Sequence, residues 1–285
     1  MNDLKIRLEA ALFLIFMNAL KKVKKRKFLK NILFSFIYHL SFNHNISLRN
    51  IAIAFPEKDE KAVKKLNKEF VYTSLNHFVD FLNAGSITKN NLKDHFSIKN
   101  YHYFEKAFKK RKGIIVISAH FGNFLLYCNC SPLIIKTKTT AILDVESTPM
   151  LRNKIIKLLS AKGASIIGRR EWHSCFYHLK NNEAFALVAD QSTGNKSTAE
   201  VDFFNRKVKY PVGPAIISFK SRAPIVPTFI ISHRSKYEII FHKPLLIDYS
   251  KSLDENIKHI IQQWASLVES YIKKYPEQYF WRLQL

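Results

Sequence analysis

The chain has 285 residues, of which 47% are hydrophobic, which provides enough apolar material for a sizeable core and argues against wholesale disorder. Its 46 Lys and Arg residues outnumber 22 Asp and Glu, and the formal net charge of +24 predicts an acidic partner: nucleic acid, an anionic membrane surface or an acidic protein. Three cysteines are too few for a disulfide framework, and the absence of GxGxxG and GxxxxGKS/T motifs argues against dinucleotide-binding and P-loop sites.

The first fifty residues narrow the choice of partner. An apolar run over 10–20 has eleven residues, short of the about 20 needed to cross a bilayer. A block with seven basic and no acidic side chains follows at 21–30, and a second apolar stretch covers 32–42. This pattern is typical of helices in a membrane interface with Lys and Arg on lipid phosphates, so we expect residues 1–45 to form a membrane-associating segment. The alternative is a pair of helices packed on the chain's own core.

A helical subdomain is predicted next, over 46–98. Residues 47–85 have helical character, with a break at 55–57 and a long helix over 57–84, in which apolar side chains recur at helical spacing.

From residue 99 the pattern changes to alternating strands and helices, which predicts one α/β domain over 99–285. The expected architecture is a mixed central sheet covered by helices. Strands are predicted at 113–120, 139–144, 164–168, 184–190, 224–232 and 236–247, and helices at 151–163, 172–182, 214–222 and 257–275.

Polar residues follow several of these strands. His120 ends a buried strand within SAHFGNF, and in open α/β sheets ligands bind outside the carboxyl ends of the strands. Gly122 and Asn123 permit a tight turn and close approach to a substrate. A histidine here fits a general base, and its alternative role is that of a satisfied structural histidine.

Asp190 ends another strand and Gln191 follows it, which predicts a carboxylate in the same crevice. A carboxylate beside an imidazole fixes its tautomer, although Asp190 also fits a helix cap. Arg169 and Arg170 follow a third strand, where they suit a phosphate or a developing oxyanion, or else form a solvated pair.

Metal and nucleic-acid sites find little support. Cys128 and Cys130 have no partners at ligand spacing, so we expect these two and Cys175 to be buried free thiols and no metal site. Helix-turn-helix and Cys/His finger signatures are absent, which leaves net charge as the sole argument for nucleic acid.

Several motifs in order resemble the bacterial lipid A late acyltransferases, the lauroyl and myristoyl transferases, which are related to phosphatidylinositol-mannoside acyltransferases. These motifs are RNIAIAFPE (49–57), SAHFGNF (118–124), GRR (168–170), the segment from Glu183 to Gln191, FFNRKVKYPVGPA (203–215), APIVP (223–227) and PEQYFW (276–281).

The resemblance implies acyl transfer from an acyl carrier protein thioester, without a cofactor, to a hydroxyl of a lipid A precursor or related glycolipid. It implies His120 as the base, with Asp190 and Arg169 as further catalytic positions and Gly122, Asn123, Arg170 and Gln191 as substrate-binding positions. The implied partners are the carrier protein, an anionic glycolipid and the cytoplasmic face of the bacterial inner membrane, and no nucleic acid.

One position departs from the family pattern. The family has an acid five residues after the histidine, and here that residue is Leu125. Asp144, Glu146 and Asp190 are the candidates to replace it. The alternative prediction is a catalytically impaired paralogue that binds lipid or carrier.

Overall fold

The computed structural model describes residues 44–142, 149–190, 197–233 and 236–281. The proposed membrane-associating segment therefore lies almost wholly outside the described residues. Within the described part of the chain, no helix combines the length and apolar character that a bilayer span requires.

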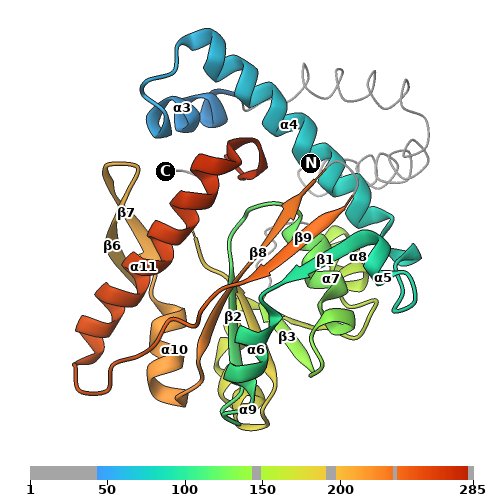
Figure 1. The fold of residues 1–285 in the computed structure, drawn as a ribbon, viewed down its shortest axis with the longest axis vertical. Helices are drawn as coiled ribbons and strands as arrows, with labels where there is room; N and C mark the ends of the chain where they lie inside the picture. Colours follow the sequence, from blue (N-terminus) through green and yellow to red (C-terminus); the bar gives the residue numbers. More distant parts are fainter. Residues whose placement is uncertain (1–43, 143–148, 191–196, 234–235, 282–285) are drawn as a thin grey trace, which may run out of the picture.

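The described chain forms a mixed α/β fold with a mostly parallel central sheet between helices (Figure 1), which confirms the predicted fold class. The helices are α3 (His44–Ala54), α4 (Glu60–Leu82), α5 (Leu92–His95), α6 (Tyr101–Phe108), α7 (Phe124–Ile134), α8 (Pro149–Leu159), α9 (Cys175–Lys180), α10 (Gly213–Ser221) and α11 (Leu253–Lys274), with 3-10 turns η1 (Ala84–Ser86), η2 (Arg169–Ser174) and η3 (Pro276–Gln278). The strands are β1 (Phe96–Lys99), β2 (Ile114–Ser118), β3 (Thr139–Ile142), β4 (Ser165–Ile167), β5 (Ala184–Val188), β6 (Thr198–Phe203), β7 (Arg206–Pro211), β8 (Ile225–Ser232) and β9 (Tyr237–Phe241).

The central sheet has the strand order β1-β9-β8-β2-β5-β3-β4 among the described residues. Strands β8, β2, β5, β3 and β4 run parallel, and β9 returns antiparallel to β8. We call the edge at which these five parallel strands end the carboxyl edge. In open α/β sheets this edge houses ligand sites.

Strand β2 lies at the centre of the sheet and explains its two cores. All five of its residues are buried, as expected for a strand covered on both faces. Ile114 and Val116 point into a core beneath α6 and α7, whereas Ile115 and Ile117 point into the larger core beneath α9, α10 and α11. The β-branched run in the sequence is thus a two-faced central strand.

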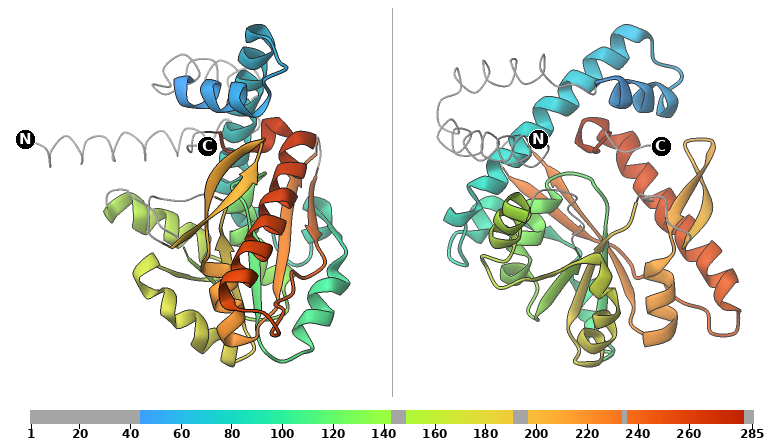
Figure 2. Two further views of the ribbon diagram at one scale, coloured as in Figure 1. Left: turned by 90° about the vertical axis from the view of Figure 1, so that its left-hand side faces the viewer. Right: turned by 180° about the vertical axis from the view of Figure 1, so that it is seen from behind.

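The long helices begin at side-chain caps. The carboxylate of Asp59 accepts from the amide of Ala62 at 2.7 Å, which starts α4. Ser252 and Glu255 form a capping box at the start of α11. Figure 1 shows α3 and α4 above one end of the sheet, and Figure 2 shows α11 beside the β6–β7 hairpin.

Two features of the chain depart from the expected elements. The predicted strand over 236–247 ends at Phe241, and only Leu245 returns as an isolated bridge to Ile225. The β6–β7 hairpin turns through Phe204 and Asn205, both with positive φ, without the glycine that normally marks such a turn.

Candidate active site

His120 lies two residues after the end of β2, at the carboxyl edge of the sheet, as its place in the sequence predicts. Its side chain is 29% exposed, so part of the imidazole is open to a substrate. The ring packs edge-on against Phe124 with 5.1 Å between centroids, and its backbone carbonyl accepts from the amide of Phe280 at 2.9 Å.

Asp190 is the carboxylate that pairs with this imidazole. Strand β5 lies next to β2 in parallel register, so the residue that follows β5 arrives beside His120. Oδ1 of Asp190 lies 2.8 Å from Nδ1 of His120, and Oδ2 accepts from the backbone amide of His120 at 3.0 Å. The carboxylate side chain is fully buried. An ionised Asp190 holds the proton on Nδ1, which leaves Nε2 as the basic nitrogen.

Two hydrogen bonds fix the backbone next to Asp190. The amide of Ala189 donates to the carbonyl of Ser118 at 3.0 Å, which continues the β2–β5 pairing up to the site. The carbonyl of Ala189 accepts from Nε1 of Trp264 at 2.8 Å. Trp264 is fully buried in α11, so the C-terminal helix helps to position the acid.

Gly122 makes the turn that returns the chain from His120 into α7. Its φ is +59°, and a Cβ added here would lie 1.7 Å from the carbonyl oxygen of Ile230. The amide of Gly122 donates to the carbonyl of Gln278 at 2.8 Å. Only glycine fits this conformation and this close approach.

Asn123 caps α7 and joins it to two other elements. Its Oδ1 accepts from the amide of Leu126 at 3.2 Å. Its Nδ2 donates to the carbonyl of His77 at 2.9 Å and to the hydroxyl of Tyr237 at 3.0 Å. Asn123 is only 2% exposed. Its side-chain amide therefore acts here as a link between α7, His77 and Tyr237.

Leu125 occupies the position of the family's acid without taking the acid's place beside His120. It packs with the apolar cluster that contains Val79 of α4 and Leu159 of α8. Of the three carboxylates considered as replacements, Asp144 and Glu146 lie outside the described residues, and Asp190 makes the contact.

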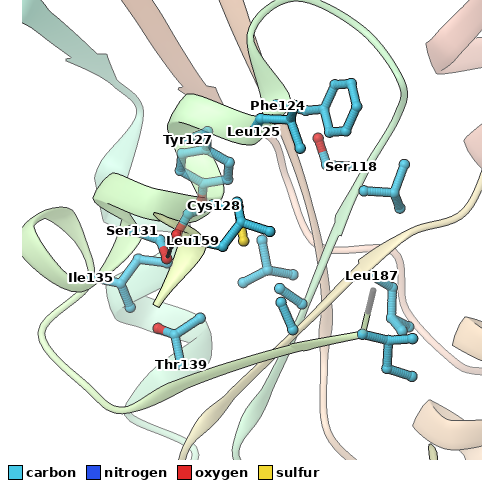
Figure 3. A pocket seen from close by; sticks show the side chains of 15 residues that line it. Ser118, Phe124, Leu125, Tyr127, Cys128, Ser131, Ile135, Thr139, Leu159 and Leu187 are labelled. Carbon is cyan, nitrogen blue, oxygen red and sulfur yellow. Dashed lines mark hydrogen bonds between the residues drawn. The ribbon is translucent and has the colours of Figure 1, made fainter. Parts of the chain in front are cut away.

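An apolar cavity begins at Phe124, whose ring contacts His120. The abundant Phe and Ile of the sequence predict a groove for an acyl chain but do not indicate which residues line it. The cavity has a volume of about 60 Å³ and lies between the sheet, α7 and α8. Figure 3 shows Ser118 and Phe124 at one end, with Ile135 and Thr139 towards the other. The lining is almost entirely hydrocarbon, which suits an alkyl chain better than a polar ligand. The cavity is formed by side chains from separated segments, so no contiguous motif signals it.

The two arginines lie farther along the same edge. Arg169 and Arg170 begin η2 directly after β4 and are exposed. Strand β4 is three positions from β2 in the sheet, which places the two strands roughly 14 Å apart at about 4.8 Å per strand. The structure therefore joins His120 to Asp190 and sets the arginines to one side, while Gln191 lies outside the described residues.

All three cysteines are free thiols. Cys130 and Cys175 are buried as expected, whereas Cys128 is half-buried. Burial raises the pKa of Cys128 and of Cys130 to about 12, and the pKa of Cys175 to about 11, so thiolates are scarce at neutral pH. Across residues 44–142, 149–190, 197–233 and 236–281, no cluster of three His, Cys, Asp or Glu residues is placed to hold a metal ion.

Comparison with known proteins adds the family. No curated protein matches the sequence. The family model described as bacterial lipid A biosynthesis acyltransferase matches residues 8–285, nearly the whole chain and every part of the site described above. The chain therefore belongs to the bacterial lipid A biosynthesis acyltransferase family.

Proposed function

We propose that this acyltransferase moves a fatty acyl group from an acyl carrier protein thioester to a hydroxyl of a lipid A precursor or related glycolipid, with His120 as the general base. The observation that supports this role is the 2.8 Å contact between Nδ1 of His120 and Oδ1 of Asp190. It turns a lone strand-end histidine into an oriented acid–base group.

The chemistry follows from that orientation. Nε2 of His120 accepts the proton of the acceptor hydroxyl as the oxygen attacks the thioester carbonyl. Buried Asp190 stabilises the resulting imidazolium, because an opposite charge in direct contact favours the charged ring. When the tetrahedral intermediate collapses, the carbon–sulfur bond breaks, an ester forms, and the imidazolium returns the proton to the carrier thiolate. The reaction balances without a cofactor.

The apolar cavity supports a role in holding the donor chain. Each buried methylene contributes about 0.8 kcal/mol to binding. At about 60 Å³ the cavity is smaller than the roughly 150 Å³ known to admit benzene in an engineered protein. We therefore expect Phe124 and Leu125 at its mouth to move aside when a long chain enters.

The remaining site residues stay predictions. We propose that Arg169 stabilises negative charge during transfer and that Arg170 binds an anionic group of the substrate, since both side chains are exposed at the carboxyl edge. Gly122 and Asn123 contribute to substrate binding by shaping the loop, and Gln191 remains a candidate from its sequence position.

The place of action is part of the proposal. Lipid A synthesis in this family is membrane-associated. We propose the cytoplasmic face of the inner membrane, because the basic block at 21–30 suits anionic lipids and the acyl carrier protein is an acidic cytoplasmic protein. The impaired-paralogue alternative rests on Leu125. The contact of Asp190 with His120 favours the active enzyme over this alternative.

Transfer of radiolabelled acyl groups from carrier thioester to lipid A precursor tests the proposal. We expect His120→Ala and Asp190→Asn each to lower kcat by about 10²–10⁴-fold, the usual contribution of general acid–base catalysis. The chain offers a matched control in its second His–carboxylate pair, His178 and Glu183, whose Nδ1 and Oε2 lie 2.7 Å apart. His178→Gln is expected to leave kcat within about twofold.

Two outcomes decide between the candidates. Full turnover by His120→Ala removes the proposed base. A wild-type protein that binds carrier and lipid but transfers nothing, and that gains activity in Leu125→Glu, identifies the impaired paralogue instead.

A further inference from the structure

A second cavity lies at the carboxyl edge, between the C-terminal half of α4 and the adjoining ends of β8 and β9. Its volume is about 610 Å³, within the about 300–1,000 Å³ typical of small-molecule sites. The lining residues are Thr73, Asn76, His77, Val79, Asp80, Asn83, Ser86, Ile87, His95, Leu126, Ser232, His233, Lys236 and Tyr237. We call it the polar cavity.

A single loop, residues 120–123, lies between the polar cavity and the dyad formed by His120 and Asp190. Asn123, three residues after His120, donates to the carbonyl of His77 and to the hydroxyl of Tyr237, and both of these residues line the cavity. The apolar cavity begins with Phe124 next to His120, and the polar cavity includes Leu126. The first turn of α7 thus lines both the apolar cavity and the polar cavity.

The lining of the polar cavity suits a ligand rich in hydroxyl groups. Hydroxyls, amides and a carboxylate come from α4 and its C-cap Asn83, from η1, and from the adjoining ends of β8 and β9. Nδ2 of Asn83 donates to the carbonyl of Val79 at 2.8 Å, which leaves Oδ1 as an acceptor for a sugar hydroxyl. The carboxylate of Asp80 accepts from the hydroxyl of Tyr237 at 2.7 Å, which fixes both groups in the lining.

One corner of the cavity suits an anion. Lys236 is exposed, and its ammonium donates to the carbonyl of Lys93 at 3.0 Å, which leaves two of its three donors for other partners. His95 and His233 add imidazole groups that can donate hydrogen bonds. Nε2 of His233 lies 3.9 Å from a carboxylate oxygen of Glu238. Glu238 also pairs with Lys99 at 3.3 Å, so the corner is not dominated by negative charge.

We propose that the polar cavity binds the phosphorylated sugar head group of the acceptor glycolipid, with Lys236 on a phosphate and the α4 side chains on sugar hydroxyls. This inference rests on the proposed function, since it places the acceptor on one side of the loop 120–123 and the donor chain on the other. The alkyl chain of the thioester then occupies the apolar cavity, the sugar occupies the polar cavity, and His120 lies between the two substrates.

Two variants change the cavity without touching the dyad. Lys236→Ala removes the cation, and Ser86→Tyr fills space from an exposed position on η1. Lys209→Ala on β7 and Ser270→Tyr on α11 are matched controls, because both residues are exposed and neither lines the cavity. Loss of one charge-assisted hydrogen bond corresponds to about a tenfold change in binding.

The kinetic test measures the acceptor and the donor separately. We expect KM for the lipid A precursor to rise about tenfold in Lys236→Ala and Ser86→Tyr, with KM for the carrier thioester and its slow hydrolysis without acceptor unchanged. Both controls are expected to match wild type. Unchanged acceptor KM in both cavity variants overturns the proposal.

A binding test keeps the cavity separate from the catalytic assignment. Titration calorimetry of the full chain uses glucosamine 6-phosphate, with glucosamine and inorganic phosphate as comparisons. We expect the sugar phosphate to bind more tightly than either comparison and Ser86→Tyr to abolish the heat. Sugar-phosphate binding without acyl transfer refutes the proposed function but not the cavity. Equal binding of inorganic phosphate and sugar phosphate refutes the sugar site.

Discussion

The acid of the dyad comes from a neighbouring strand and not from the helix that follows the histidine. A carboxylate at position 125 would stand on the first turn of α7, among apolar side chains of α4 and α8. Asp190 instead follows β5, and the β2–β5 register delivers it to His120 at 2.8 Å. An acid at the end of a strand is anchored by backbone pairing, so its position does not depend on a flexible side chain at a helix start.

His77 gives the clearest pH dependence at the scale of one residue. Burial lowers its pKa to about 4, because the charged imidazolium loses its hydration. The unfolded chain binds this proton near the ordinary pKa of about 6.5. Between pH 4 and about pH 6.5 the unfolded state binds more protons than the folded state. The stability that the uncharged His77 contributes is therefore fully present above about pH 6.5. It falls by on the order of 3 kcal/mol as the pH drops towards 4.

Urea denaturation at a series of pH values checks this expectation. His77→Gln removes the titrating group, and its unfolding free energy should vary less between pH 4.5 and about 6.5 than that of wild type. An equally steep fall in the variant would assign the acid sensitivity to other groups.

The two residues of the dyad could be predicted from the sequence because each ends a recognisable strand. The sequence also placed Asp190 in the same crevice as His120. It could not choose among Asp144, Glu146 and Asp190 as the partner of His120, since strand order is set by non-local packing that no local pattern encodes. Trp264 and Gln278 were also missed as supports of the site. Each looks like an ordinary apolar or polar position, and its role depends on which backbone group lies opposite in the fold.

At the scale of elements, the turn between β2 and α7 depends on Gly122. Gly122→Ala would bring a methyl group to 1.7 Å from the carbonyl oxygen of Ile230, in a backbone region that side chains avoid. We expect a loss of at least about 2 kcal/mol in unfolding free energy, measured by thermal and chemical denaturation, together with loss of transfer activity.

Gly213 provides the comparison for this substitution. It begins α10, and an added Cβ meets no atom within 4 Å. Gly213→Ala should therefore leave stability unchanged or raise it by up to about 1 kcal/mol. Similar losses in both variants would show that the clash with Ile230 relaxes.

Strongly patterned elements were predicted well and weakly patterned ones were not. The helix predicted over 57–84 is α4 (Glu60–Leu82), with its start fixed by the Asp59 cap. Helix α7 has no amphipathic period, because it is apolar on most sides and lies between the sheet and α4. Apolar residues therefore do not recur at the 3.6-residue spacing that predicts an amphipathic helix. Strand β1 and helix α6 are short, and they gain their structure from pairing with β9 and packing on the sheet.

At the scale of the whole molecule, the net charge of +24 gives a prediction for the donor. Long-range attraction accelerates the encounter with an acidic carrier protein and weakens as salt shortens the Debye length from about 10 Å at 0.1 M to about 3 Å at 1 M. We expect kcat/KM for the carrier thioester to fall about tenfold or more over this range. An uncharged acyl-pantetheine thioester, assayed alongside it, should show little change, and equal sensitivity of both donors would argue against electrostatic capture.

Residues 278–281, which follow α11, complete the site. Phe280 donates to the carbonyl of His120, Gln278 accepts from Gly122, and the carbonyl of Trp281 accepts from Asn50 of α3. A polypeptide is synthesised from its N-terminus, so these contacts cannot form until residues 278–281 have been made. A nascent chain, even one already drawn to a membrane, therefore lacks a finished catalytic loop. Truncation before residue 276 would remove the PEQYFW motif and leave the motifs around His120 and Asp190 without the contacts that position them.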